Sequence, residues 1–114
     1  MKIWVDDVRP APDISYLVCK SVKETINAIV DFENIYGTKE NPKFIEPICH
    51  LDIELIDLDH DAGDYAIDGG DYIKILDWLE ETGRNYPIRI HSANPVGVEN
   101  MRRIIKKNGW EEVK

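Results

Sequence analysis

The 114-residue sequence predicts an α/β fold with a five-stranded, mostly parallel sheet and helices on both faces of the sheet. Short apolar runs of strand length alternate along the chain with longer segments whose apolar residues recur at helical spacing. The run at residues 53–58 is apolar on both faces apart from its acidic positions, as expected for a central parallel strand. These observations together predict one layered domain that spans residues 1–114.

The first elements are two short strands joined by a proline-containing connection. Residues 2–6 (KIWVD) and 16–19 (YLVC) are the strands, and the VRPAPDI segment between them can neither continue a strand nor build a helix. The connection from Asp7 to Ser15 has nine residues, whereas a parallel crossover normally needs about a dozen. Either the connection is an extended crossover or the second strand pairs differently.

Local signals fix the ends of the helices. Ser21 fits a helix N-cap, Glu24 completes a capping box, and Gly37 ends the helix that follows. A surface loop is expected at 37–47 because glycine, proline and asparagine are frequent there. The remaining predicted elements are the strand at 53–58, a glycine-containing loop at 60–70, a helix at about 71–81, a strand at 87–90, a helix that starts after Asn94 and stops at Gly109, and a final strand at 110–113.

Composition limits the classes of function. The formal net charge of −8 disfavours nonspecific binding to nucleic acid, because the field of the protein repels a polyanion. No apolar run is long enough to cross a bilayer, and no signal peptide precedes the first strand, so we expect a cytoplasmic protein without a membrane partner. Cys19 and Cys49 do not have a metal-binding spacing and are expected to be buried free thiols.

Polar side chains follow three of the predicted strands at the point where each strand ends. Asp6 and Asp7 follow KIWV, residues 59–61 (DHD) follow IELIDL, and residues 91–94 (HSAN) follow PIRI. The carboxyl ends of parallel strands meet at one edge of the sheet, where carboxylates repel one another unless a cation or a proton holds them. The oxygen ligands favour Mg²⁺ or Mn²⁺. The candidate metal ligands are Asp6, Asp7, Asp59 and Asp61, although Asp61 could instead cap the following loop.

Other residues at these strand ends suit phosphate chemistry. His60 and His91 are candidates for general acid and base catalysis or for metal binding, although each alone could be structural. Ser92 fits a hydroxyl that contacts phosphate, and Arg9 could clamp a phosphate with two hydrogen bonds or could be an exposed loop arginine. Asn94 is explained as a helix N-cap, and the same helix N-terminus offers N–H groups to an anion.

The motifs IWVDD, SVKETINAI, LIDLD and IHSA resemble the receiver-domain family, whose fold is flavodoxin-like. The resemblance implies that Asp6 and Asp7 bind Mg²⁺, that Asp59 is the phosphoacceptor position, and that Ser92 contacts the phosphoryl group. The first receiver helix is reduced to the VRPAP loop, and the last helix is missing after the fifth strand. No Lys-Pro pair follows that strand, and Lys114 is a poor substitute for the phosphate-binding lysine of receivers.

A closer resemblance comes from IWVDDVRPAP, LDHD, GGDYIKILDWL and HSANPVGVENM, which are similar to the cyclic-phosphate-processing receiver domains. The family name implies action on a cyclic phosphate, either a cyclic nucleotide or an RNA end. We therefore expect a metal-dependent phosphodiesterase in which Asp59 helps to hold the metal and His60 and His91 share the acid and base roles.

Two other functions stay open at this point. A signalling receiver would accept a phosphoryl group on Asp59, and a binding module would hold a cyclic nucleotide without cleaving it. For the expected phosphodiesterase, the partner is a small phosphorylated ligand or an RNA end. The sequence leaves open which cyclic phosphate is bound, how many metals are present, which histidine is the acid, and the oligomeric state.

Overall fold

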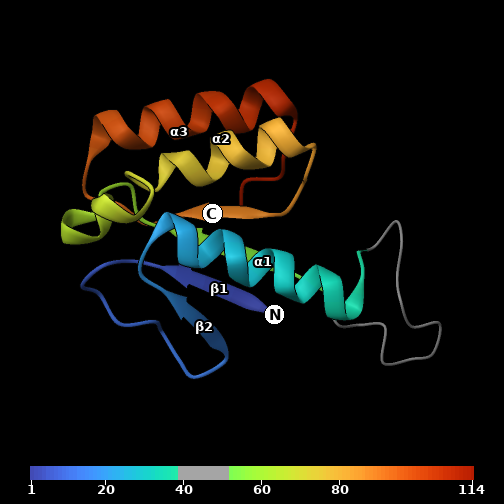
Figure 1. The fold of residues 1–114 in the computed structure, drawn as a ribbon. Helices are drawn as coiled ribbons and strands as arrows, with labels where there is room; N and C mark the ends of the chain where they lie inside the picture. Colours follow the sequence, from blue (N-terminus) through green and yellow to red (C-terminus); the bar gives the residue numbers. More distant parts are fainter. Residues whose placement is uncertain (39–51) are drawn as a thin grey trace.

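The computed structural model describes residues 1–38 and 52–114, so most of the predicted loop after Gly37 and Cys49 lie outside the described residues. Figure 1 shows the arrangement of the elements along the chain. The elements are β1 (Lys2–Val5), β2 (Tyr16–Cys19), α1 (Val22–Tyr36), β3 (Leu55–Leu58), the 3-10 helix η2 (Gly63–Asp68), α2 (Ile73–Thr82), β4 (Ile88–Ile90) and α3 (Pro95–Asn108).

The described strands form one parallel sheet in the order β2-β1-β3-β4. Because β2 pairs with β1 in parallel, the connection from Asp7 to Ser15 is an extended crossover without a helix, which was one of the two alternatives. The prediction that the first helix is reduced is therefore confirmed. The strand order places β1 and β3, which carry the aspartates, at the centre of the sheet.

The predicted five-stranded sheet is wrong for the residues described here, because the sheet has four strands. The segment expected as the fifth strand makes one parallel bridge, between Ile88 and Glu112. Its hydrogen bonds to β4 come from the carbonyl of Glu111 and the N–H of Val113, both with Ile88. Trp110 cannot join, because its N–H still donates to the carbonyl of Ile105 at the end of α3. Too few residues are left to build a ladder.

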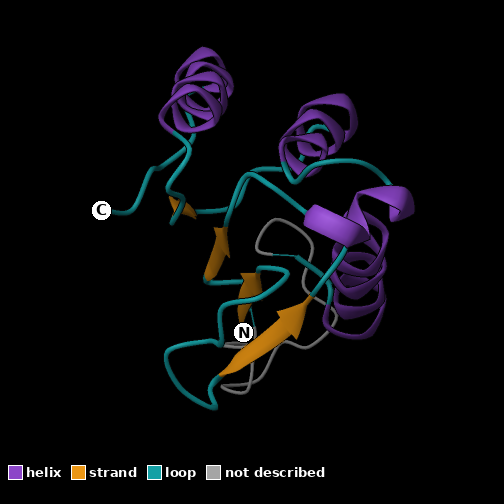
Figure 2. Cartoon of the chain, turned by 90° about the vertical axis from the view of Figure 1, so that its left-hand side faces the viewer, coloured by secondary structure: helices purple, strands orange, loops and turns teal. Residues whose placement is uncertain are grey.

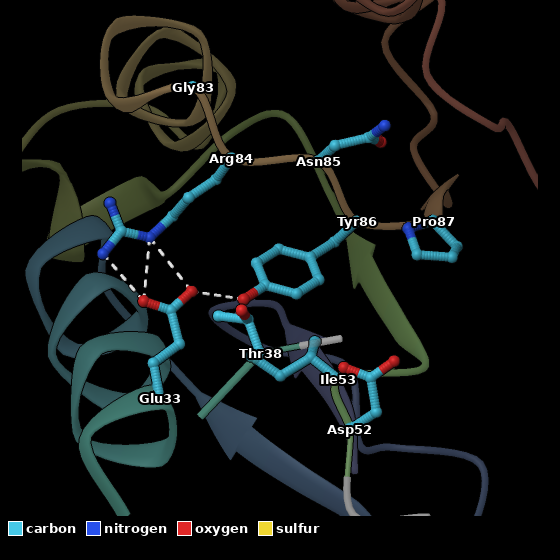
Figure 3. Close-up of a pocket in the computed structure, with 9 residues that line it drawn as sticks. All are labelled: Glu33, Thr38, Asp52, Ile53, Gly83, Arg84, Asn85, Tyr86 and Pro87. Carbon is cyan, nitrogen blue, oxygen red and sulfur yellow. Dashed lines mark hydrogen bonds and ion pairs between the residues drawn. The ribbon is translucent and has the colours of Figure 1, made fainter. Parts of the chain in front are cut away.

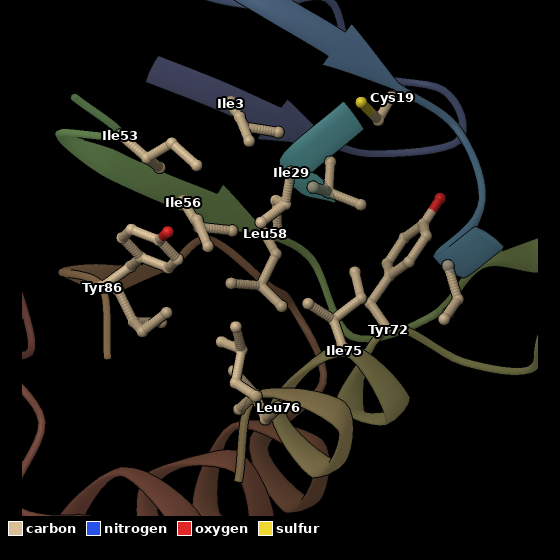
Figure 4. Packing of buried hydrophobic residues seen from close by; sticks show 14 of the residues in the cluster. Ile3, Cys19, Ile29, Ile53, Ile56, Leu58, Tyr72, Ile75, Leu76 and Tyr86 are labelled. Atoms are coloured by element: carbon tan, nitrogen blue, oxygen red, sulfur yellow. The ribbon is translucent and has the colours of Figure 1, made fainter. Parts of the chain in front are cut away.

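For the residues that the structure describes, the expectation of helices on both faces is also wrong. Residues of β1, β3 and β4 that alternate along each strand, such as Ile3, Ile56 and Ile88, form one core cluster with buried residues of all three α-helices. Figure 2 shows the three helices on the same side of the strands, and Figure 4 shows side chains of the strands and of α2 meeting in this core. In the described residues, no helix forms between β1 and β2 or after α3, so no helix covers the other face.

The face of the sheet that lacks helices has an aromatic cover of its own. Trp4 points to this face and is 7% exposed. Its indole N–H donates to the carbonyl of Arg9 at 2.9 Å, which fixes the connection after β1. The Tyr16 ring meets the Trp4 ring edge to face, with centroids 5.9 Å apart. β2 and the crossover thus each contact Trp4, the first through the Tyr16 ring and the second through a hydrogen bond.

The predicted N-caps are confirmed, but the Glu24 carboxylate of the expected capping box accepts the N–H of Lys20 and not that of Ser21. The hydroxyl of Ser21 accepts the N–H of Glu24 at 3.0 Å, and the side chain of Asn94 accepts the N–H of Gly97 at 3.0 Å. The helices α1 and α3 end at glycines with positive φ, as expected. The predicted loop at 60–70 contains the short helix η2, which the sequence analysis missed. Among the described helices, none has the length and hydrophobicity that a membrane span requires.

Cys19 is a buried free thiol, as predicted. Burial raises the pKa of this thiol to about 11. The thiolate is the reactive form of cysteine, so Cys19 is chemically inert in the folded protein.

Candidate functional site

The register of the sheet brings four strand ends to one level. Val5 at the end of β1 pairs with the last residue of β2 and with Leu58 of β3, and Leu58 pairs with the last residue of β4. All four strands point the same way, so the residues that follow them gather at one edge. These residues are Asp6, Lys20, Asp59 and His91.

Three carboxylates meet at this edge and are called the acidic cluster below: Asp6, Asp7 and Asp59. One oxygen of each lies within 4.8 Å of the other two. Asp6 is fully buried and Asp59 is 7% exposed, so water screens their charges poorly. The structure thus brings together three of the four residues that the sequence predicted as metal ligands.

The electrostatics of the acidic cluster fit a bound cation. Burial raises the pKa of Asp7, and the negative charges of Asp6 and Asp59 raise it further. Burial also acts to raise the pKa of Asp6, but the N–H groups of Arg9 and Val8 and the His91 ring outweigh it and lower that pKa. Asp6 therefore stays ionised while Asp7 repels its neighbours. A set of oxygen donors with uncompensated negative charge is what Mg²⁺ or Mn²⁺ requires.

Gly63 at the start of η2 closes one side of the acidic cluster. Its φ is +56°, and a Cβ atom at this position would lie 2.4 Å from Oδ2 of Asp7. Any side chain would therefore both strain the backbone and displace the Asp7 carboxylate. The glycine lets the backbone approach the cluster closely.

His91 is held between two buried carboxylates. Its Nδ1 lies 2.6 Å from Oδ1 of Asp57, and its Nε2 lies 2.9 Å from Oδ2 of Asp6. The ring stacks on Trp4 with centroids 3.8 Å apart and an interplanar angle of 6°. A neutral imidazole has one N–H and can donate to one carboxylate, so this arrangement needs a second proton on the ring or on one carboxyl group. Both ring nitrogens are engaged, which makes His91 a group that orients Asp6.

The second oxygen of Asp57 is a buried atom without a hydrogen-bond partner in the described residues. Asp57 is 1% exposed, and the Nε of Arg89 lies 3.9 Å from this oxygen, beyond hydrogen-bond distance. The negative charge of Asp57 is therefore compensated mainly by His91, and the two residues depend on each other.

His60 has a different environment at the same edge: its side chain is 15% exposed and packs against α3 at Gly97, and the carboxylate it contacts, Asp61, is exposed. Its Nδ1 lies 2.8 Å from Oδ1 of Asp61, and the amide of Asn94 donates to the same carboxylate at 3.3 Å. The hydrogen bond with His60 lowers the pKa of Asp61 against the opposing effect of burial. The Nε2 of His60 has no hydrogen-bond partner in the part of the chain that the structure describes. A ring held at Nδ1 with Nε2 unpaired is suited to move a proton.

Asp61 lies apart from the acidic cluster, with His60 and Asp71. One ligand atom from each of these three residues lies within 4.8 Å of the other two. Asp71 also accepts the N–H of Ala62 at 3.0 Å, which shapes the loop that carries His60. The Asp61 carboxylate makes its shortest hydrogen bond with the His60 ring, so its contacts support a role in orienting this ring.

Three further predicted residues, Arg9, Ser92 and Asn94, lie near the site. The backbone N–H of Arg9 donates to Oδ1 of Asp6 at 2.9 Å, and Arg9 is an exposed loop residue. The hydroxyl of Ser92 accepts the N–H of Asn94 at 3.1 Å. Asn94 caps α3 and also binds Asp61, so its amide is engaged on both sides. Phosphate binding by these three residues stays a prediction.

Lys20, Asp57 and Asp71 lie at the site although no role was predicted for them. The sequence pattern could have placed two of the three at this edge. Lys20 directly follows a predicted strand, and Asp57 alternates with Asp59 along β3, so both could be placed at the same edge. Asp71 had no such signal, because its position depends on the path of the loop after β3.

A pocket of about 410 Å³ lies at the opposite edge of the sheet, near the residues that precede β3 and β4. Figure 3 shows Arg84 reaching across it to the carboxylate of Glu33. The Nη2 of Arg84 lies 2.7 Å from Oε1 of Glu33, and the hydroxyl of Tyr86 donates to the same carboxylate. These groups satisfy one another and tie α1 to the start of β4. The pocket is separate from the acidic cluster.

Replacing Gly97 with alanine should displace the His60 ring. Gly97 lies in the first turn of α3, and a Cβ atom there would lie 2.4 Å from Cγ of His60. The ring must move and lose its hydrogen bond with Asp61, although alanine favours the helix by up to about 1 kcal/mol. Long-range ¹H–¹⁵N NMR spectra should show changed Nδ1 and Nε2 shifts for His60. Val96→Ala, an exposed change in the same turn, should leave them unchanged, and unchanged shifts in Gly97→Ala would contradict the contact.

Comparison with known proteins gives one result. A family model described as "Cyclic-phosphate processing Receiver domain" matches residues 1–107. No curated protein and no solved structure matches the chain. The matched range includes the acidic cluster, His60, His91 and all four described strands.

Proposed function

This chain belongs to the cyclic-phosphate processing receiver domain family, and from that premise we propose that it is a metal-dependent phosphodiesterase that opens a cyclic phosphate. The observation that carries the proposal is what the end of β3 supplies. Asp59 belongs to the acidic cluster, and the next residue, His60, has its ring held at Nδ1 by Asp61 while Nε2 is unpaired among the described residues.

Asp6, Asp7 and Asp59 would hold a divalent cation, Mg²⁺ or Mn²⁺. The bound cation would neutralise charge on the phosphate and make an attacking water more acidic. The backbone around these residues is already fixed, since the N–H groups of Val8 and Arg9 donate to Asp6. The ligands therefore lose little conformational freedom when the cation binds.

His60 would act as the general base. Asp61 holds Nδ1, which leaves the lone pair of Nε2 to accept a proton from water as the water oxygen bonds to phosphorus. The bond between phosphorus and one ribose oxygen breaks, and the leaving oxygen takes a proton from solvent. His91 is less suited to this step, because both of its nitrogens contact carboxylates. It would instead keep Asp6 oriented toward the cation.

The proposal is tested with the purified protein in Mg²⁺, in Mn²⁺ or with chelator, against cyclic nucleotides and an RNA that ends in a 2′,3′-cyclic phosphate. Mass spectrometry should detect the addition of one water to one of these substrates, and the chelator should stop it. His60→Ala should lower turnover by about 100-fold or more, which is the usual contribution of a general base. Asp64→Ala, an exposed change on η2, should have no effect.

Two outcomes would contradict the phosphodiesterase. One is the absence of turnover across the panel in every metal, and the other is full activity in His60→Ala. If turnover is absent but Asp59 becomes phosphorylated by a small phosphate donor, the chain is a signalling receiver. If a cyclic nucleotide binds and is recovered intact, the chain is a binding module.

A further inference from the structure

Lys20 is a positively charged residue at the carboxyl edge of the sheet, and the proposed phosphodiesterase mechanism gives it no role. We propose that Lys20 binds the phosphate of the substrate. It would take the role that receivers give to the phosphate-binding lysine after their last strand. This inference rests on the proposed function, because it assumes a phosphate ligand beside the acidic cluster. Lys20 follows β2 directly and is level with Asp6 across the sheet.

The ammonium group of Lys20 reaches the backbone beside the acidic cluster without pairing with its carboxylates. Its Nζ donates to the backbone carbonyl of Asp7 at 3.2 Å. A lysine ammonium has three N–H donors, so this contact leaves two donors for the oxygens of a ligand. The residue is half-buried, which strengthens its interaction with an anion compared with a fully solvated lysine.

The backbone of Lys20 is fixed from two sides. Its N–H donates to Oε1 of Glu24 in α1 at 2.7 Å, and its carbonyl accepts the hydroxyl of Tyr72 at 2.6 Å. Tyr72 is fully buried, and its own N–H donates to the carbonyl of His60 at 3.0 Å. One buried tyrosine therefore links the strand end that carries Lys20 to the loop that carries His60. The backbone of Lys20 is therefore held at a fixed position with respect to the backbone of His60, the proposed base.

The charge balance of the site requires such a cation. Three ionised carboxylates around one divalent cation leave one negative charge, and a cyclic phosphate diester brings another. Without a further positive charge, the loaded site would repel its substrate. Lys20 restores neutrality before the phosphate binds and gives the phosphate a charged partner. Hydrogen bonds between charged groups are the strong class of hydrogen bonds in proteins.

Lys114, the lysine at the position after the expected last strand, is engaged elsewhere. Its Nζ lies 3.1 Å from the carboxylate of Glu112. Glu112 bridges to β4 at Ile88, which is the first residue of that strand and so lies away from the carboxyl edge. Lys114 is therefore at the wrong end of β4 to contact a phosphate at the acidic cluster.

A competing explanation is that Lys20 only neutralises the acidic cluster until a metal displaces it. The two explanations predict different changes in Mn²⁺ affinity and in phosphate affinity when Lys20 is replaced. If Lys20 competes with the metal, its removal should tighten Mn²⁺ binding and leave phosphate binding unchanged. If Lys20 binds phosphate, its removal should weaken phosphate binding and change Mn²⁺ binding little.

The experiment compares wild type, Lys20→Met and Lys20→Arg, with Lys23→Met as the matched control. Lys23 is exposed in the first turn of α1 and gives the same change of net charge. Mn²⁺ affinity is measured by electron paramagnetic resonance. Binding of inorganic phosphate to the Mn²⁺-loaded protein is measured by ³¹P line broadening.

Lys20→Met should weaken phosphate binding by about tenfold or more, as expected for loss of a charged hydrogen bond, with Mn²⁺ affinity within about twofold of wild type. Lys20→Arg should retain part of the affinity, and Lys23→Met should match wild type. Equal phosphate affinity in Lys20→Met and wild type would overturn the proposed role of Lys20 but not the proposed phosphodiesterase activity. A wild-type protein that binds phosphate but turns over no cyclic phosphate would refute the phosphodiesterase and keep Lys20 as an anion ligand. Failure of wild type to bind phosphate would overturn both.

Discussion

Replacing His91 with alanine should destabilise the protein by about 3–5 kcal/mol, the cost expected when one partner of a buried ion pair is removed. His91 contacts Asp57 and Asp6, which are 1% and 0% exposed. Without the ring, both carboxylates lose the hydrogen-bond partner that compensates their negative charge. Trp4 also loses the ring on which it stacks. A loss of this size is a large part of the total stability of a small domain.

Urea unfolding followed by circular dichroism measures this effect. The matched control is His60→Ala, which removes a ring of similar burial, 15% against 13% exposed, whose carboxylate partner Asp61 is exposed and stays hydrated. This variant should therefore lose clearly less stability than His91→Ala. The double variant His91→Ala/Asp57→Asn should recover part of the loss, because it removes one of the two uncompensated charges. Equal stability of the two histidine variants, in the absence of metal, would mean that His91 is not the partner that holds these carboxylates.

Replacing Asp59 with asparagine should weaken Mn²⁺ binding and turnover by at least about 100-fold. Changes around a metal ligand commonly cost 10–100-fold, and removal of a ligand should cost more. Asparagine keeps an oxygen that can accept the N–H of His60, so the loop after β3 should keep its path. The change also removes one of three mutually repelling charges in the acidic cluster, so stability without metal should be equal to or higher than that of wild type.

The metal affinity of Asp59→Asn is measured by electron paramagnetic resonance and its stability by urea unfolding, both against Asp61→Asn. Asp61 holds the His60 ring outside the acidic cluster. Asp61→Asn should lower turnover but leave Mn²⁺ affinity within a few fold. If Asp61→Asn weakens Mn²⁺ as strongly as Asp59→Asn does, both residues coordinate the metal, and the division into two groups of ligands is wrong.

The sequence predicted best those features that depend on neighbouring residues. Ser21 and Asn94 cap helices through residues three positions away, and Gly37 and Gly109 end them, so each signal is complete within a few residues. The edge that carries the site was also predictable, because parallel strands place their carboxyl ends together. The family resemblance is confirmed by the match over residues 1–107.

Features that depend on distant residues were predicted less well. The number of strands depended on whether the segment after Gly109 could leave the end of α3 in time to pair with β4, and Trp110 still bonds to that helix. The face that each helix covers is set by packing across the whole sheet. The partners of His91 come from residues 34 and 85 positions away, so spacing along the chain could not reveal that both ring nitrogens are engaged.

The strand order has a consequence for how the protein assembles during synthesis. β1 leaves the ribosome first, but its partner β3 follows about fifty residues later, and β4 joins only through β3. The surroundings of Asp6 are therefore complete only after Asp59 and His91 have been synthesised and have joined the sheet. Pairings between such distant segments form slowly, because the intervening chain must close a loop first. A nascent chain that ends before residue 91 should fail to retain Mn²⁺, so acquisition of the metal would be a late event that reports a finished sheet.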